Sequence, residues 1–168
     1  MTIFALSTAN GIAGLAVIRV SGHLALTALK TLSRKSHFEP NMMTRTNFFD
    51  PNTSELIDKG LAVFFSKPNS FTGEDVVEIH IHGGISTVNL ALKALGAVDQ
   101  LRLAEPGEFS KRAFINNKMD LTAIEAMGDL INAQTEAQHS QALSQMGGSL
   151  NKLYMSWRKA LIELVAYL

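Results

Sequence analysis

The sequence predicts an α+β protein in which a mixed β-sheet with packed helices is followed by an all-α segment. Up to Lys118, short runs typical of β-strands alternate with runs of helical spacing. From Leu121 the strand pattern stops, and apolar residues recur only every three or four positions. The composition, with 46% apolar and 18% charged residues, is that of a chain that buries a core. We therefore expect one domain over residues 1–118 and the beginning of a helical domain over residues 119–168.

The elements of the first part follow from the periodicity of its apolar residues. Strands are predicted where β-type residues are bounded by turn-forming residues, at Ile3–Leu6, Leu15–Val20, Thr46–Phe49, Gly60–Phe65 and Val76–Ile81. Helices are predicted where apolar residues share one face, at Leu24–Leu32, Ile85–Ala97 and Pro106–Asn116. The ring of Pro106 suits the first turn of the last helix. Helices packed on a mixed sheet are the expected result.

The second part carries an apolar stripe at helical spacing. It begins with Leu121 and, after an interruption, runs from Leu143 to Leu168 in steps that fit one long helix face. Gly147 and Gly148 weaken the middle of this helix by about 1 kcal/mol each relative to alanine. The stripe reaches the last residue without a glycine cap or a trailing proline. We therefore expect the chain to be a fragment, or half of an assembly, whose stripe packs on further helices.

Charge and composition exclude several classes of protein. Fifteen Lys and Arg residues balance fifteen Asp and Glu residues, so a global field that attracts nucleic acid is missing and any RNA contact must be local. The absence of cysteine excludes disulfides, thiolate zinc sites and thiol nucleophiles, and suits a cytoplasmic protein. No run reaches the roughly 18 apolar residues that a membrane helix requires. We expect no membrane partner.

Two groups of side chains are candidates for chemistry. Strand alternation places Glu78, His80 and His82 on one face, where they form either a zinc site or the polar outer face of a half-buried strand. Arg19 ends an apolar strand face, where it either holds a ligand carboxylate at two points or extends to water.

One short motif points to a nucleotide. Asn117-Lys118-Met119-Asp120 matches the N-K-x-D pattern with which GTPases read guanine. A GTPase also needs a G-x-x-x-x-G-K-[ST] loop for the phosphates, and the sequence has none. We interpret the match as chance.

Four longer motifs occur together in a fixed order. They are Gly14–Gly22 (GLAVIRVSG), Pro68–Asp75 (PNSFTGED), Glu78 followed by His82-Gly83-Gly84, and Pro106–Phe114 followed by Asn116–Leu121. As a set they resemble the amino-terminal part of the MnmE (TrmE) family of tRNA-modifying GTPases. The resemblance covers essentially the whole chain.

The resemblance implies a fold, a cofactor and site residues. The family's amino-terminal domain binds a tetrahydrofolate derivative, 5-formyl- or 5,10-methylenetetrahydrofolate, in a fold similar to the folate-binding part of aminomethyltransferases, and it forms the homodimer. The folate-contacting Arg, Glu and Lys of the family fall on Arg19, Glu78 and Lys118. Together with a flavin-dependent partner, MnmG (GidA), the family attaches an aminomethyl or carboxymethylaminomethyl group to carbon 5 of the wobble uridine of tRNA.

The resemblance also implies what this chain lacks. The GTPase domain of the family, with its sites for GTP, Mg²⁺ and K⁺, has no counterpart in the motifs of this sequence, so we expect no GTP hydrolysis by the chain alone. Two alternatives remain open. The chain is either a dimerising scaffold that docks a partner, or a stand-alone enzyme, folate-dependent or metal-dependent through Glu78, His80 and His82. The resemblance disfavours the metal-dependent alternative, because His82 coincides with the histidine of the family's H-G-G turn, for which we expect no metal role.

Overall fold

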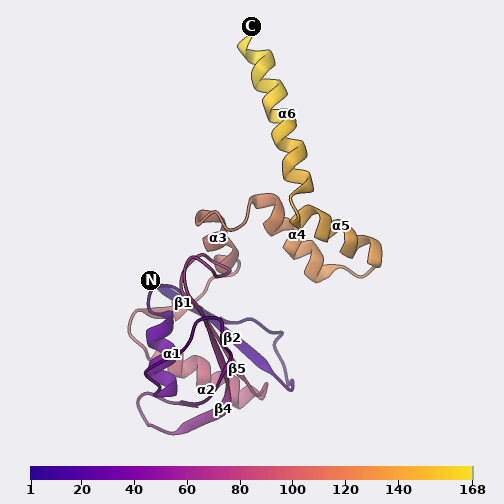
Figure 1. The fold of residues 1–168 in the computed structure, drawn as a ribbon. Coiled ribbons are helices and arrows are strands. Elements are labelled where there is room, and N and C mark those ends of the chain that lie inside the picture. The colour runs from indigo at the N-terminus through magenta and orange to yellow at the C-terminus, as the bar shows by residue number, and fades with distance from the viewer. Residues whose placement is uncertain (168) are drawn as a thin grey trace. The chain divides into compact units, whose positions relative to one another are not determined.

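The computed structural model of the protein describes residues 1–167 and contains two compact units (Figure 1). The first unit is Met1–Arg112, and the second begins at Ala113. All the strands of the described chain lie in the first unit, and from Leu121 the described elements are helices only. The predicted fold class, a mixed sheet with helices followed by an all-α segment, is confirmed.

The first unit is built on one six-stranded sheet with the order β3-β4-β5-β2-β1-β6. The strands are β1 (Thr2–Leu6), β2 (Ala16–Ser21), β3 (Thr44–Phe49), β4 (Leu56–Phe65), β5 (Val76–Ile81) and β6 (Leu101–Leu103). Neighbouring strands are antiparallel, except that β1 and β6 are parallel, so the sheet is mixed. The five predicted strands are present. Strand β6 was not predicted, because three residues are too few to show an alternating pattern.

One face of the sheet carries the hydrophobic core. Helices α1 (Ala25–Ser33) and α2 (Ile85–Gly96) pack against the sheet and contact each other. The strands contribute to this core through fully or almost fully buried side chains that include Phe4, Ile18, Val20, Phe64, Val77 and Ile79. Each such side chain contributes about 1.5–3 kcal/mol when it leaves water. Because side chains alternate along a strand, the residues between these positions lie on the opposite face.

The helices of the second unit begin and end at recognisable caps. They are α4 (Leu121–Asn132), α5 (Glu136–Met146) and α6 (Ser149–Ala166), and they follow α3 (Glu108–Ile115), which spans the boundary between the units. Asp120 caps α4 by accepting a hydrogen bond from the amide of Ala123 at 2.8 Å. Thr135 and Gln138 form a reciprocal capping box at the start of α5. Within residues 1–167, no helix combines the length and apolar character needed to cross a membrane.

The prediction of one long helix from Leu143 is wrong. Helix α5 ends at Met146, and α6 begins at Ser149. Gly148, the residue before α6, has a φ of 84°, a left-handed conformation that glycine adopts without the clash of a Cβ atom. The glycine pair therefore separates two helices rather than weakening one. The apolar stripe continues along α6, and its last residue, Leu168, lies outside the described residues.

Gly22 connects the end of β2 to α1 at a point where the backbone leaves no room for a side chain. Its φ is 133°, and a Cβ atom at this position would lie 2.6 Å from Oγ1 and 2.8 Å from Cα of Thr2. The same Thr2 Oγ1 accepts a hydrogen bond from the amide of Leu24 at 3.0 Å, so it is not free to move aside. Glycine is required here by both conformation and space.

We expect Gly22→Ala to lower the free energy of unfolding of the first unit by about 3 kcal/mol, the sum of backbone strain and overpacking. Gly14→Ala is the matched control, because no atom lies within 4 Å of a Cβ atom built at Gly14. The control should change the free energy of unfolding by no more than about 0.5–1 kcal/mol. Urea unfolding followed by circular dichroism measures both variants, and equal stabilities would contradict this account of Gly22.

Candidate functional site

Arg19 and Glu78 form an ion pair on the sheet face opposite the core. The antiparallel pairing of β2 with β5 places Arg19 directly opposite Glu78. Both Nε and Nη2 of Arg19 donate to Oε1 of Glu78, at 3.0 and 2.7 Å. The side chains are 27% and 20% exposed, so the pair is largely buried but accessible from solvent. Two of the three predicted site residues therefore lie in contact.

Two phenylalanine rings flank the guanidinium of Arg19. Its Cζ atom lies 5.1 Å from the ring centroid of Phe71 and 5.9 Å from that of Phe109. Both separations are within the range of a cation–π interaction. Phe71 belongs to the segment between β4 and β5, and Phe109 belongs to the start of α3. Arg19 is thus held by a carboxylate and by aromatic rings from two separate segments.

An ionic network fixes the two segments that carry these rings. Arg112 donates to Glu74 Oε2 at 2.9 Å and to Glu108 Oε1 at 3.0 Å, and so links the segment before β5 to α3. Arg102 donates through two nitrogens to Glu108, at 2.7 and 2.6 Å. Glu108 is only 9% exposed. The hydrogen bonds from Arg102, reinforced by the amide of Glu105 and by Arg112, lower the pKa of Glu108 to about 2.

The sequence does not predict this network. Glu74, Glu108 and Arg112 lie inside two of the long motifs, which gave no sign that they contact one another. An ion pair between residues 38 positions apart, such as Arg112 and Glu74, leaves no periodic signal along the chain.

We expect Glu108→Gln to lower the free energy of unfolding at pH 7 by about 2 kcal/mol, because it leaves Arg102 without its carboxylate and leaves Arg112 with that of Glu74 alone. The pKa of Glu108 is lowered in the folded protein from 4.5 to about 2. Its contribution is therefore complete above pH 4.5 and is lost as the pH falls toward 2. Urea unfolding at pH 7 and pH 3 should show a smaller difference between wild type and variant at the lower pH. A difference independent of pH would contradict the assigned role.

His82 pairs with Asp58 rather than with Glu78. It follows β5 directly, its amide donates to Asp58 Oδ2 at 2.8 Å, and its Nδ1 lies 2.9 Å from Asp58 Oδ1. Partial burial raises the pKa of Asp58, but the hydrogen bonds from the amide and ring of His82 outweigh it, and the pKa is lowered overall. Within the described part of the chain, no three His, Asp or Glu residues are grouped to hold a metal ion. Glu78, His80 and His82 thus do not form the metal site that one alternative required.

Lys118, the third predicted site residue, lies in the second unit and is exposed. Asn117, two residues beyond the last residue of α3, has a left-handed conformation with a φ of 55°. The amide of Lys118 then donates to the carbonyl of Ala113 at 2.8 Å, and the amide of Asn117 to that of Phe114 at 3.0 Å. This is the Schellman pattern of a helix end. Since Asp120 caps the next helix, the N-K-x-D tetrad is made of the residues that end one helix and begin the next.

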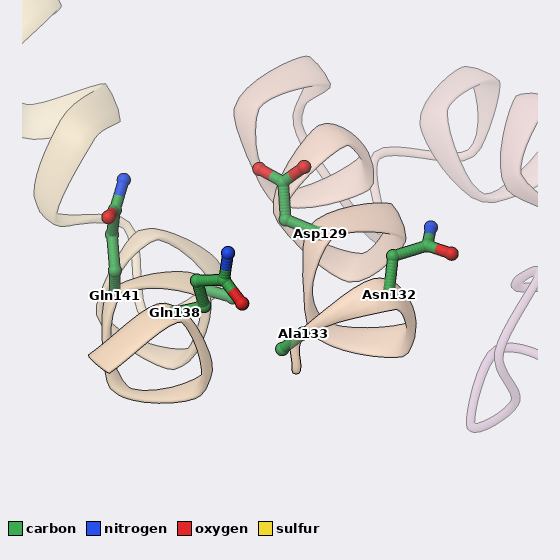
Figure 2. Close-up of a pocket in the computed structure, with 6 residues that line it drawn as sticks. Asp129, Asn132, Ala133, Gln138 and Gln141 are labelled. Carbon is green, nitrogen blue, oxygen red and sulfur yellow. The ribbon is translucent and has the colours of Figure 1, made fainter. Parts of the chain in front are cut away.

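Two hollows of the structure are lined by other residues. Figure 2 shows the first, about 200 Å³ in volume, where Asp129, Asn132, Gln138 and Gln141 extend polar ends from α4 and α5. The second, about 250 Å³, lies in the first unit and is lined mostly by apolar residues of the segment after β1 and the start of α2. Neither is lined by Arg19, Glu78 or Lys118. The candidate site is therefore defined by its ionic and aromatic side chains.

Comparison with known proteins gives two adjacent family matches. Residues 2–118 match the family described as GTP-binding protein TrmE N-terminus, and residues 121–168 match the family described as MnmE helical domain. Similar curated relatives carry the name tRNA modification GTPase MnmE. They include proteins from Parvibaculum lavamentivorans and Rickettsia bellii, each 52% identical, and Rickettsia typhi, 50% identical. Each match covers 99% of this chain but only 38% of the relative's length.

Proposed function

The chain belongs to the MnmE family of tRNA modification GTPases, and on this premise we propose that it is a folate-binding, dimerising module of a tRNA-modifying enzyme. The observation that carries the proposal is the largely buried, solvent-accessible pair of Arg19 and Glu78, flanked by two phenylalanine rings. We assign folate binding and dimerisation to residues 1–118 and the first part of the helical domain to residues 119–168. The family matches, which divide the chain between residues 118 and 121, support this assignment.

The chemistry of the Arg19–Glu78 pair fits a folate. The pterin ring of a folate presents neighbouring N–H donors along one edge, as a guanidinium does. Glu78 already accepts two N–H groups from the guanidinium of Arg19, which supports its capacity to bind such an edge. Phe71 and Phe109 offer flat apolar surfaces beside it. Glu78 would hold the pterin, and Arg19 or Lys118 would neutralise the glutamyl carboxylates.

The bound cofactor, 5-formyl- or 5,10-methylenetetrahydrofolate, would supply a one-carbon unit. The residues of this chain bind and orient it, and the remaining parts of the machinery belong to other segments or partners. In the proposed assembly, a homodimer acts in the cytoplasm with the flavin-dependent MnmG (GidA) on tRNA. It adds an aminomethyl or carboxymethylaminomethyl group to carbon 5 of the wobble uridine. This sequence carries no phosphate-binding loop, so we assign the binding of GTP, Mg²⁺ and K⁺ to the GTPase domain of the family and not to these residues.

A second candidate function is a scaffold that dimerises and docks a partner without binding folate. The apolar residues along α6 favour it, because Trp157, Leu161 and Leu164 are exposed in the described structure. Light scattering and folate titration on the same preparation separate the two functions. A dimer that binds folate supports the module, whereas a dimer that leaves folate unbound supports the scaffold.

We expect calorimetric titration of the 168-residue chain with 5-formyltetrahydrofolate to show saturable binding. Glu78→Gln should weaken it by about 100-fold, since it removes the charge from two hydrogen bonds to the ligand. Glu55→Gln, an exposed carboxylate change in the same unit, is the matched control and should bind as the wild type does. Unchanged affinity in Glu78→Gln would refute the assignment of the pterin to Glu78.

The role of Lys118 is tested by a pair of lysine variants. We expect Lys118→Ala to weaken 5-formyltetrahydrofolate binding by about 5- to 10-fold, because it removes one exposed charge that would face the ligand's carboxylates. Lys111→Ala removes an equally exposed charge from α3 and should have no effect. Equal losses in both variants would mean that only the general charge of this region matters.

A further inference from the structure

The two oxygens of Glu78 have different surroundings. Oε1 accepts both hydrogen bonds from Arg19. Oε2 lies 3.6 Å from Nε2 of His80, which is too far for a hydrogen bond. Within residues 1–167, His80 Nε2 is the buried side-chain nitrogen or oxygen that has no hydrogen-bond partner. The side chain of His80 is 16% exposed as a whole, while this nitrogen is shielded from water.

A buried polar atom without a partner is costly, and folded proteins keep few of them. The strands on both sides of His80 offer it no partner, because the residues directly opposite are Val17 on β2 and Leu61 on β4. The carboxylate of Glu78 is the charged group that faces His80 Nε2. A carboxylate oxygen at this distance favours the tautomer of His80 that carries a hydrogen on Nε2. In the other tautomer, the lone pair of Nε2 would face a lone pair of the carboxylate oxygen.

A ligand that binds Glu78 disturbs this arrangement, and the existence of such a ligand rests on the proposed function. A ligand edge with two parallel N–H donors needs both oxygens of the carboxylate. Oε1 already accepts from two nitrogens of Arg19, so such a ligand must displace the guanidinium from it. Glu78 then loses the contact that fixes its side chain.

We propose that His80 is the positioning residue that replaces this contact. Once Arg19 is displaced, Nε2–H of His80 donates to Oε2 of Glu78 and holds the carboxylate in place for the ligand. The required approach, from 3.6 Å to about 2.9 Å, is within reach of a rotation about the last side-chain torsion of glutamate, which is soft. The partnerless nitrogen of the ligand-free protein is thus a donor that becomes satisfied in the complex.

Two variants of His80 distinguish positioning from a structural role. We expect His80→Leu to bind 5-formyltetrahydrofolate about 10-fold more weakly, since one charge-assisted hydrogen bond is lost. Its melting temperature without ligand should not fall, because an apolar side chain replaces a buried donor that had no partner. His80→Gln, whose amide can donate, should recover the affinity to within about 3-fold of wild type.

Three results would overturn the proposal. One is wild-type affinity in His80→Leu. Another is a parallel loss of affinity and melting temperature in that variant, which indicates a structural role. The last is a failure of His80→Gln to recover the affinity although the variant folds.

A second experiment tests His80 without a ligand. Arg19→Met removes the donors from Glu78 but keeps an apolar chain beside Phe71 and Phe109. If His80 donates a hydrogen bond to Glu78 once Arg19 is removed, Arg19→Met should lower the melting temperature by about 3 °C more in the His80→Leu background than in the wild type. Equal losses would refute the role of His80. If the wild type binds no folate while the losses differ, the proposed function fails and the coupling of His80 to Glu78 stands.

Discussion

The antiparallel register of β2 and β5 decides both what the first unit buries and what it presents to solvent. Ile18 lies opposite Ile79, and both are buried in the core beneath the helices. One position along, Arg19 lies opposite Glu78 on the other face. A shift of one residue in either strand would exchange the faces, exposing an isoleucine and forcing a charge into the core. The same register therefore buries the core residues and brings Arg19 and Glu78 together, so neither can form without the other.

The face opposite the core combines buried apolar side chains, such as Ile3, Val63 and Val76, with a network of polar contacts. The segment between β4 and β5 is bound to the sheet by the buried contact of Ser21 with Thr72, whose hydroxyl oxygens lie 2.7 Å apart. Arg112 joins that segment to α3 through Glu74 and Glu108. These bonds bring Phe71 and Phe109 to the same guanidinium, although the two rings are 38 residues apart in the sequence. The long motifs that identify the family therefore also explain the architecture around Arg19.

Sequence patterns predicted the elements of the fold well because those elements depend on local periodicity. Five strands and the helices of the first unit followed from residue spacing, and β6 did not, because it is too short to carry a pattern. The break at Gly147–Gly148 was misjudged, since the stripe on both sides kept helical spacing and only backbone conformation reveals the separation. The ion pairs of Arg112 and the contact of His82 with Asp58 were not predicted, because a contact between distant residues depends on the register of the sheet and on where the helices dock.

The pairing of Arg19 with Glu78 also bears on what a ligand at this position must supply. A largely buried carboxylate without a partner would be unfavourable, and Arg19 relieves this with donors that resemble the edge of a pterin. A ligand that binds both oxygens of Glu78 must replace those donors, so its net affinity is reduced by the free energy of the pair that it breaks. A ligand that displaces Arg19 with a single donor replaces only part of what is lost, whereas one with two parallel donors restores it. The ion pair therefore lowers the affinity of ligands that displace it and, among these, favours those that match the geometry of a guanidinium.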